Sequence, residues 1–497
     1  MNKELVVKSL FWTLISTLVC ICSFFIMHNA AWLLGDDCQS IIYTGWDKPI
    51  FGFFVDPSLG RFFPLDYTIY DVLCLFYDGQ IPPSAHFFMH VLGFILFVGS
   101  FIAITLNILR EVDSLYKYTV ALLVVVLAVG RTLGLFVECW TGIWTIFTFL
   151  ALFLWCHIKF MDTHKCSWAI IALLSINYII YYYETIFIIP LSLGGCAFLF
   201  SYKSQDKNDK TYNALLIASG LLFLLLYAVL VLPRVEHYYS HHIEVSPFMN
   251  AVKMFFAQKI MWIVIILLLF RMYLIIKRKT QFNLYDNLLL AACAYFCGAA
   301  FLGLNFTLYY IPGVLVAIPS ILYFSNEYLK QKGTIVLFVC LAGIYGQKIP
   351  KVISENQKHR VSTYNNVQLF IKEIGNGSDV YFYELRNPVL EDWELEIRSY
   401  HKFYLETVTG WYMNDKDFSI ERKYDFNNEN GLWQVVKSDQ ETFMQLCPLA
   451  EEIIDFGEYK VYRVSNESQH YIPSTACPVF VKVNKDSNCT HFLNPKL

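Results

Sequence analysis

Charged residues are scarce in this chain, and that scarcity is the first guide to its class. Only 16% of the 497 residues are Asp, Glu, Lys or Arg, while 56% are hydrophobic. A soluble domain usually has about a quarter of its residues charged, so the composition excludes an ordinary soluble protein and indicates a membrane protein. With a formal net charge of -3, nothing indicates a nucleic-acid partner.

Nucleotide-binding signatures are also missing from the sequence. It contains neither a phosphate-loop motif nor a dinucleotide fingerprint. The loops expected on the cytoplasmic side are too short for a nucleotide-binding domain. Any chemistry is therefore expected on the extracytoplasmic side, where an activated donor would be linked to a lipid.

Apolar segments recur along the first two thirds of the chain. A membrane span needs about 20 mostly apolar residues, and eleven segments approach or reach that length, the third and the last being short. They are 10–27, 84–108, 118–131, 142–158, 167–182, 185–202, 213–233, 258–276, 287–304, 309–325 and 333–347. The sequence therefore predicts a polytopic α-helical membrane domain over 1–347, whose first segment is retained rather than cleaved.

The Lys and Arg residues alternate between rich and poor loops, which sets the orientation. The rich set includes Lys3, Arg110, Lys159, Lys207 and Lys277. The poor set contains Lys48, Arg61, Arg131, Arg234 and Lys253, with Lys259 at a helix start. The rule predicts a cytoplasmic N-terminus and an extracytoplasmic C-terminal part.

Two outer segments are long enough for structure of their own. The first, 28–83, is rich in aromatic residues and is expected to lie along the membrane interface. The second, 348–497, is more polar, with a helix-like stretch at 363–374 and strand-like runs at 379–384 and 459–464. This pattern predicts a small extracytoplasmic α+β domain.

Most of the 14 cysteines lie in or near apolar segments, where they act as small hydrophobic side chains. Cys447, Cys477 and Cys489 lie in the polar tail. An oxidising compartment would allow one disulfide among them, but three cysteines fix no framework.

Ionisable groups are nearly absent from the interiors of the predicted spans, which argues against an ion-coupled transporter. Polar groups gather instead at the outer boundary. The clearest are Asp36 and Asp37, just after the first span. They suit a general base and its orienting or cation-binding partner, or simply a Gly-Asp-Asp turn that ends the helix.

Three outer arginines are candidate phosphate ligands because the guanidinium is a planar, permanently charged donor. Arg61 lies among aromatic residues and could instead anchor an interfacial helix. Arg131 could instead pair with Glu138, and Arg234 lies in the loop before 258.

Four further residues are candidate contacts for a sugar or an acceptor: Glu138, Glu184, His237 and Tyr309. Glu184 could instead cap the helix that follows it. His237 and His241 have metal-ligand spacing, but no clear third ligand accompanies them. We therefore predict no metal site here.

The acidic pair after the first span, the aromatic outer loop with Gly60-Arg61-Phe62, the many spans and the outer C-terminal domain resemble the GT-C superfamily of polytopic membrane glycosyltransferases. The combination is most similar to bacterial O-antigen glucosyltransferases of the Gtr type. The architecture covers residues 1 to about 350, and the specific motifs lie within 35–64.

The resemblance implies a cell-envelope enzyme of the bacterial inner membrane, acting in glycan biosynthesis. It implies a polyprenyl-phosphate sugar donor, a glycan or lipid-linked acceptor, and inversion at the anomeric carbon. Asp36 or Asp37 would be the base. No cofactor is required, although a divalent cation is compatible with the site. A lipid-linked glycan flippase and a glycan repeat polymerase are the alternative functions.

Overall fold

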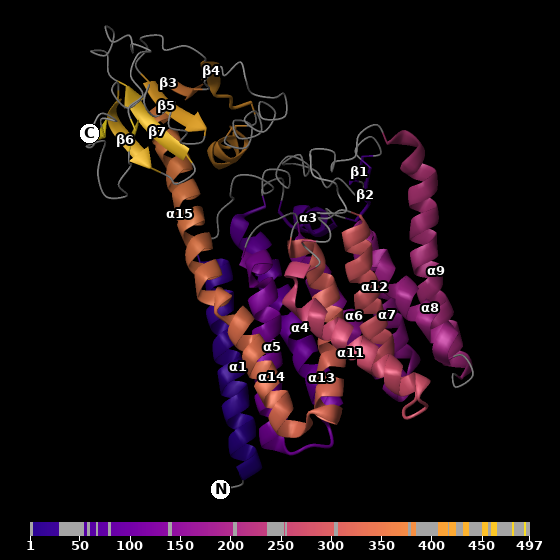
Figure 1. Ribbon diagram of the computed structural model, residues 1–497. Coiled ribbons are helices and arrows are strands. Elements are labelled where there is room, and N and C mark those ends of the chain that lie inside the picture. Colours follow the sequence, from indigo (N-terminus) through magenta and orange to yellow (C-terminus); the bar gives the residue numbers. More distant parts are fainter. Residues whose placement is uncertain are drawn as a thin grey trace. The chain divides into compact units, whose positions relative to one another are not determined.

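The computed structural model describes the chain in segments (Figure 1). The described residues are 3–28, 54–56, 60–65, 68–77, 81–137, 142–201, 206–235, 253, 256–302, 307–375, 379–383, 406–415, 417–423, 431–436, 450–455, 459–464, 480–481 and 492–493. They belong to two compact units, a helical one that extends to Ser354 and a second that follows from Glu355.

The helical unit is an array of long apolar helices (Figure 1). They are α1 (Lys3–Met27), α4 (Pro83–Ile108), α5 (Ser114–Val137), α6 (Ile143–Thr163), α7 (Cys166–Ile180), α8 (Ile188–Ser201), α9 (Lys207–Leu230), α11 (Lys259–Ile276), α12 (Leu284–Phe301), α13 (Ile311–Tyr328) and α14 (Lys330–Gly346), with the short α3 (Thr68–Cys74). Among the described residues ten helices are long and apolar enough to cross a membrane, and α7 is an eleventh, shorter apolar helix. The predicted class of polytopic α-helical membrane protein is confirmed.

Helix α5 is longer than the segment 118–131 predicted from hydropathy. It continues to Val137, so that Gly130 and Arg131 lie inside the helix rather than in a loop. An apolar run that is interrupted by one charge can remain helical when the charge finds a polar site. Boundaries drawn at charged residues are therefore too short here.

Burial separates inner helices from outer ones. The apolar windows of α4, α5, α6 and α13 are mostly buried in the unit, whereas those of α1, α9, α11 and α14 are mostly exposed. Helix α11 exposes Trp262, Ile266 and Leu269. An exposed apolar face of this kind suits contact with lipid.

Helices α5 and α14 cross with their backbones in close contact. A Cβ atom on Gly130 would lie 2.5 Å from the carbonyl oxygen of Tyr345, and one on Gly346 would lie 2.7 Å from Cγ1 of Val126. Small residues allow helices to approach this closely. The crossing fixes Arg131 of α5 beside the end of α14.

One buried ion pair joins α11 to the start of α12. The Arg271 guanidinium donates two hydrogen bonds to the Asp286 carboxylate, at 2.7 and 2.8 Å, and a third to the carbonyl of Gln281 at 3.1 Å. Its Nη1 bonds to the hydroxyl of Tyr328. Asp286 also completes a capping box with Asn283 at the N-terminus of α12. The charge inside α11 is thereby neutralised and fully hydrogen-bonded.

The second unit contains a mixed five-stranded sheet. Its strands are β3 (Asp379–Tyr383), β4 (Glu421–Lys423), β5 (Gly431–Val436), β6 (Ala450–Asp455) and β7 (Tyr459–Val464), in the order β4-β3-β5-β7-β6. Strand β3 is parallel to β4 and β5, whereas β7 is antiparallel to β5 and β6. A short pair, β8 (Phe480–Val481) and β9 (Phe492–Leu493), completes the described strands. The predicted α+β class and both predicted strands are confirmed.

Helix α14 ends at Gly346, next to the predicted boundary between residues 347 and 348. Helix α15 begins at Lys348 and continues to Gly375, and the helix-like stretch predicted at 363–374 is its last part. Hydropathy falls at 348, but helix formation depends on backbone propensity as well, and the polar residues that follow are compatible with a helix.

We expect Asp286→Ala to destabilise the protein strongly, because it leaves the Arg271 charge buried without its partner. Such a loss costs about 3–5 kcal/mol. Equilibrium unfolding in detergent measures it, and Arg271→Met combined with Asp286→Leu should recover most of the stability. Arg110→Met, which removes an exposed ion pair with Glu111, is the control and should change stability by no more than about 1 kcal/mol. Equal effects of Asp286→Ala and Arg110→Met would contradict the assignment.

Candidate functional site

A short hairpin lies at the end of the bundle where α7 turns into α8 (Figure 1). Strands β1 (Phe54–Asp56) and β2 (Arg61–Phe63) pair antiparallel, with Asp56 opposite Arg61. Gly60 precedes β2 with φ of +71°, a backbone conformation that residues other than glycine rarely adopt. The sequence Gly60-Arg61 thus has a local structural reason: the glycine turns the chain so that the arginine starts the strand.

Strand β2 is fastened to the α7–α8 turn by a carboxyl group. The backbone N–H of Phe62 donates a hydrogen bond to Oε1 of Glu184 at 2.7 Å. Glu184 starts the 3₁₀ helix η1 (Glu184–Phe187), which leads directly into α8. The carboxyl group therefore binds the arginine-bearing strand rather than only capping the helix.

Two further backbone contacts hold the same segment. The hydroxyl of Tyr227, on α9, donates to the carbonyl of Gly60 at 2.9 Å. The N–H of Leu65 donates to the carbonyl of Tyr181 at 3.1 Å. Phe62 is 4% exposed and packs against the rings of Tyr181 and Phe223. The backbone on both sides of Arg61 is thus held by α7, η1 and α9.

Three tyrosines from separate elements meet beside this hairpin. Tyr183 stacks on Tyr309 of η3 (Thr307–Tyr310) with ring centroids 5.8 Å apart. The hydroxyl of Tyr295, on α12, donates to the carbonyl of Tyr309 at 3.0 Å and lies 2.9 Å from Oγ1 of Thr185. These bonds fix the turn before α8 against the turn before α13.

The hydroxyl of Tyr183 is buried and has no hydrogen-bond partner among the described residues. Burial raises the pKa of Tyr183 well above its usual value, so the phenol stays neutral and can donate. Tyr295, Tyr309 and Glu184 raise this pKa further, and the Arg61 cation lowers it. A buried donor without an acceptor costs about 1–3 kcal/mol. This hydroxyl is therefore the polar atom here that most needs a ligand.

We call these five residues the Arg61 cluster: Arg61, Tyr183, Glu184, Tyr295 and Tyr309. They come from four parts of the chain and interact with one another electrostatically. The Arg61 guanidinium lies over the ring of Phe63, 5.4 Å from its centroid. Of the candidates named from the sequence, the cluster brings together Arg61, Glu184 and Tyr309. Sequence reasoning missed Tyr183 and Tyr295, which carry no motif.

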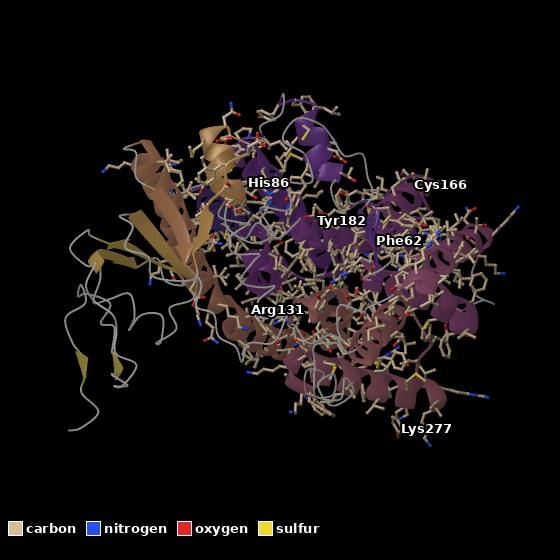
Figure 2. The ribbon with its side chains drawn as sticks, turned by 90° about the horizontal axis from the view of Figure 1, so that it is seen from above. Phe62, His86, Arg131, Cys166, Tyr182 and Lys277 are labelled. Carbon is tan, nitrogen blue, oxygen red and sulfur yellow. The ribbon has the colours of Figure 1, made fainter. Side chains whose placement is uncertain are left out.

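The other two candidate arginines lie elsewhere. Arg131 donates from Nη2 to Oε1 of Gln258 at 3.1 Å and lies over the ring of Tyr345. In the view of Figure 2 it is well separated from Phe62, the neighbour of Arg61. Arg234 is exposed at the end of η2 (Leu232–Arg234), and its side chain donates a hydrogen bond to the carbonyl of Leu230 at 3.4 Å. The three arginines do not form one site.

The remaining sequence candidates lie outside the described residues. They are Asp36, Asp37, Glu138, His237 and its neighbour His241, and the cysteines Cys447, Cys477 and Cys489. Their roles stay predictions.

A buried histidine pair that sequence reasoning missed lies near the start of α4. Nε2 of His86 and Nε2 of His90 are 2.8 Å apart, and Nδ1 of His90 is 2.9 Å from the carbonyl of Phe136. Because that carbonyl requires a proton on Nδ1 of His90, His86 donates the shared hydrogen bond. The four-residue spacing of the two histidines in an apolar helix is the sequence signal that could have predicted the pair. The contact between His90 and the Phe136 carbonyl links α4 to α5.

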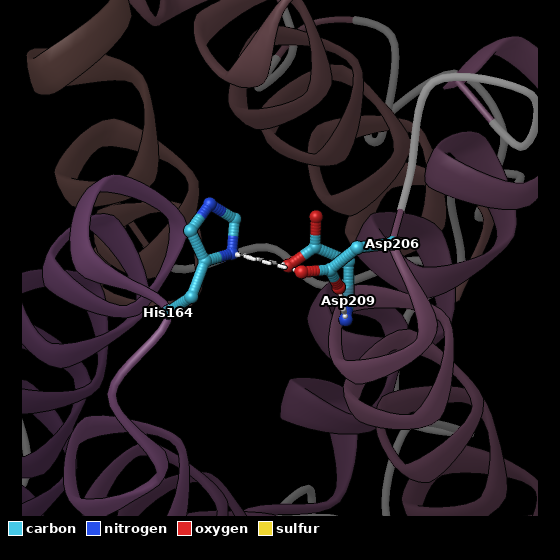
Figure 3. A group of neighbouring side chains, drawn as sticks. All are labelled: His164, Asp206 and Asp209. Atoms are coloured by element: carbon cyan, nitrogen blue, oxygen red, sulfur yellow. Dashed lines mark hydrogen bonds and ion pairs between the residues drawn. The ribbon is translucent and has the colours of Figure 1, made fainter.

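One group among the described residues has metal-ligand spacing: His164, Asp206 and Asp209, whose ligand atoms lie within 4.8 Å of one another (Figure 3). Nδ1 of His164 is 3.0 Å from Oδ1 of Asp209 and 3.7 Å from Oδ2 of Asp206. Asp206 also caps α9 through the N–H of Asp209. These bonds fasten the end of α6 to the start of α9, and we assign the group that structural role.

Similar proteins are found by comparing structures and not by comparing sequences. Searches of protein-family models and of curated proteins give no match. The crystal structure of ArnT from Cupriavidus metallidurans in the apo state is similar with a TM-score of 0.47 and 10% identity, covering 93% of this chain and 99% of that one. The apo Archaeoglobus fulgidus oligosaccharyltransferase has a TM-score of 0.41 and 14% identity, covering 72% of this chain and 56% of that one. Likenesses of this size carry no argument about activity.

We expect Glu184→Ala to loosen strand β2, because the Phe62 N–H loses its acceptor. A buried donor that is left without an acceptor costs about 1–3 kcal/mol. Hydrogen exchange of the peptide that contains Phe62 should therefore accelerate about tenfold or more. Glu184→Gln keeps an acceptor oxygen and should show a smaller change. Unchanged exchange in the Ala variant would contradict the anchoring role.

Proposed function

We propose that this chain is a membrane glycosyltransferase. It transfers a sugar from a polyprenyl-phosphate donor to an extracytoplasmic glycan or lipid-linked acceptor, with inversion at the anomeric carbon. The observation that supports this most is the Arg61 cluster, where a cation and a buried phenol without an acceptor among the described residues occupy the same end of the helical unit. In this proposal the unit lies in the bacterial inner membrane, with the cluster and the C-terminal unit on the extracytoplasmic side.

The cluster suits a sugar phosphate because it combines two kinds of donor. The Arg61 guanidinium can share charge-assisted hydrogen bonds with phosphate oxygens. The Tyr183 hydroxyl can donate to a further oxygen of the phosphate or sugar. The aromatic surfaces of Tyr183 and Tyr309 offer a place for a sugar ring, whereas the carboxyl group of Glu184 is directed to the backbone of Phe62.

The chemistry follows from these positions. The acceptor hydroxyl attacks the anomeric carbon, the bond from that carbon to the phosphate oxygen breaks, and the bonding electrons leave on the polyprenyl phosphate. A base removes the acceptor proton as the new bond forms. Arg61 stabilises the negative charge that develops on the leaving phosphate, which is where a fixed cation contributes most.

We assign the base to Asp36 or Asp37, with Asp36 preferred. This assignment rests on the resemblance of the sequence, because both residues lie outside the described segments. Adjacent side chains generally point in different directions, so one of the two carboxylates would face the acceptor. The mechanism requires no metal ion or other cofactor.

The rival function of a lipid-linked glycan flippase needs a polar, often cationic, central cavity. Within the described helices the fully buried cation is Arg271, and its charge is already neutralised by Asp286. This observation favours the transferase over the flippase.

Purified protein in detergent should release polyprenyl phosphate from a synthetic polyprenyl-phosphate sugar when an acceptor is supplied. Replacing the true base, as Asp36→Asn or Asp37→Asn, should lower turnover about 10²–10⁴-fold while donor binding is kept. The neighbouring Asn variant should cost less. Robust turnover in the double Asn variant would exclude both residues as the base. No turnover with any sugar and acceptor tried would argue against the transferase itself.

We expect Arg61→Ala to weaken donor use strongly, and Arg61→Lys to restore it only in part, because an ammonium cannot reproduce the planar fork. Tyr183→Phe should also reduce donor use, by about tenfold, since one hydrogen bond to a charged group is lost. Steady-state kinetics with the synthetic donor measures both. Arg110→Ala and Tyr273→Phe, exposed and outside the cluster, are the matched controls. Wild-type kinetics in both cluster variants would place the donor phosphate elsewhere.

A further inference from the structure

Tyr182 lies in the chain between Tyr181 and Tyr183, yet its own side chain contacts the start of another helix. The ring is 2% exposed, and its hydroxyl reaches Gly142, the residue before α6. A Cβ atom on Gly142 would overlap the Tyr182 hydroxyl oxygen and would lie 2.9 Å from Cζ of the same ring. The hydroxyl therefore occupies the space that a side chain at position 142 would need.

Gly142 has a second reason to be glycine, which is its backbone conformation. Its φ and ψ are +60° and +13°, in the left-handed region that costs other residues about 1–2 kcal/mol. The Gly142 carbonyl accepts hydrogen bonds from the backbone N–H and the hydroxyl of Thr145, at 2.8 and 2.7 Å. Thr145 is buried in the first turn of α6. The backbone beneath the Tyr182 hydroxyl is thus fixed to α6.

The Tyr182 ring is also placed by aromatic neighbours. Its centroid lies 5.7 Å from that of Tyr178 on α7, and the Tyr178 centroid lies 4.7 Å from that of Phe149 on α6. Aromatic pairs at such distances are favourable contacts. Tyr182 is therefore held both by α7 and by the residue that begins α6.

The chain on both sides of Tyr182 binds the segment that contains strand β2. The residue before it, Tyr181, accepts the Leu65 N–H through its carbonyl at 3.1 Å. Two residues after it, Glu184 accepts the Phe62 N–H. In the view of Figure 2, Tyr182 lies close to Phe62. A shift of Tyr182 would therefore move both of these acceptors.

Tyr182 also sets the direction of Tyr183. The backbone of Tyr183 is extended, with φ of -151° and ψ of +109°, and adjacent side chains of an extended chain point to opposite sides. The Tyr182 side chain points to Gly142, so the Tyr183 side chain points the other way, where it stacks on Tyr309. The position of the Tyr183 hydroxyl therefore depends on the contact between Tyr182 and Gly142.

We propose that Gly142 is a positioning residue for the Arg61 cluster. By leaving room for the Tyr182 hydroxyl, it sets where Tyr183 and Glu184 lie relative to Arg61, although Gly142 itself is outside the cluster. The effect on a substrate rests on the proposed function: a side chain at position 142 displaces Tyr183 and weakens binding of the donor phosphate. The base that removes the acceptor proton is not affected.

The test compares Gly142→Ala with Gly142→Ala combined with Tyr182→Phe, in the full-length protein in detergent. Alanine adds the Cβ atom that overlaps the hydroxyl, and phenylalanine removes the hydroxyl while keeping the ring. Two quantities are measured: hydrogen exchange of the peptide that contains Phe62 and Leu65, and binding of a synthetic polyprenyl-phosphate sugar.

We expect Gly142→Ala to accelerate that exchange and to weaken donor binding about tenfold, which corresponds to the loss of roughly one hydrogen bond. The double variant should recover part of both, because the oxygen that overlaps the Cβ atom is gone. Its melting temperature should stay below that of the wild type, because the left-handed strain remains. The pH dependence of turnover, which reports the base, should be the same in all variants.

Gly99→Ala is the matched control, because a Cβ atom at that position of α4 meets no atom within 4 Å, and it should bind the donor as the wild type does. Gly142→Ala combined with Tyr273→Phe removes an exposed hydroxyl elsewhere and should show no recovery. Tyr182→Ala removes the contact without changing Gly142, and it should also accelerate exchange. It decides the question if Gly142→Ala gives no folded protein.

Unchanged exchange and donor binding in Gly142→Ala would overturn the proposal, as would unchanged exchange in Tyr182→Ala where the alanine variant at 142 does not fold. Equal losses with and without Tyr182→Phe would also overturn it, because they would arise from backbone strain alone. If the wild type binds no donor, the proposed function fails, while accelerated exchange that Tyr182→Phe reverses would still support the positioning role of Gly142.

Discussion

Polar groups inside a bilayer find no water to bond with, and this constraint explains the placement of charge throughout the helical unit. Helices form their own backbone hydrogen bonds, so the polar groups that still need partners are those of side chains. Arg271 meets that cost with Asp286, Tyr328 and a backbone carbonyl. Other cations, such as Lys207, Lys259 and Lys330, lie at helix ends, where water and lipid phosphates are accessible. The Arg61 cluster is a polar feature for which helix packing alone gives no reason.

Arg61 and Arg131 are held in different ways. Arg61 lies on a strand that is fixed through backbone hydrogen bonds from Phe62 and Leu65. Arg131 lies within a helix, and its side chain itself is clamped by Gln258 and Tyr345.

Much of the helical unit could be predicted from the sequence because apolar runs report directly on membrane spans. The prediction is wrong where a charge interrupts such a run: α5 continues through Arg131 because Tyr345 and Gln258 accommodate the guanidinium. Such accommodation depends on neighbours that are distant in sequence.

The candidate site could be predicted only in part for the same reason. Arg61 and Glu184 are charged residues between apolar runs, which made them candidates. They are connected through the backbone N–H of Phe62, and every residue type except proline has such a group, so the sequence cannot reveal the contact. Tyr183 and Tyr295 belong to a chain with 33 tyrosines, and only the meeting of η1, α12 and η3 distinguishes them.

The hydrogen bond between Phe62 and Glu184 has a consequence for how such a site can diversify. Because the strand that bears Arg61 is tied to the same turn that holds Tyr183, the cation and the phenol keep their spacing whatever the flanking loops do. The segments before Gly60 and after Leu65 can then change in length or sequence to suit a different substrate, without changing the spacing of Arg61 and Tyr183. The outer loop can then vary with the substrate, while the anchored Arg61 and Tyr183 stay the same.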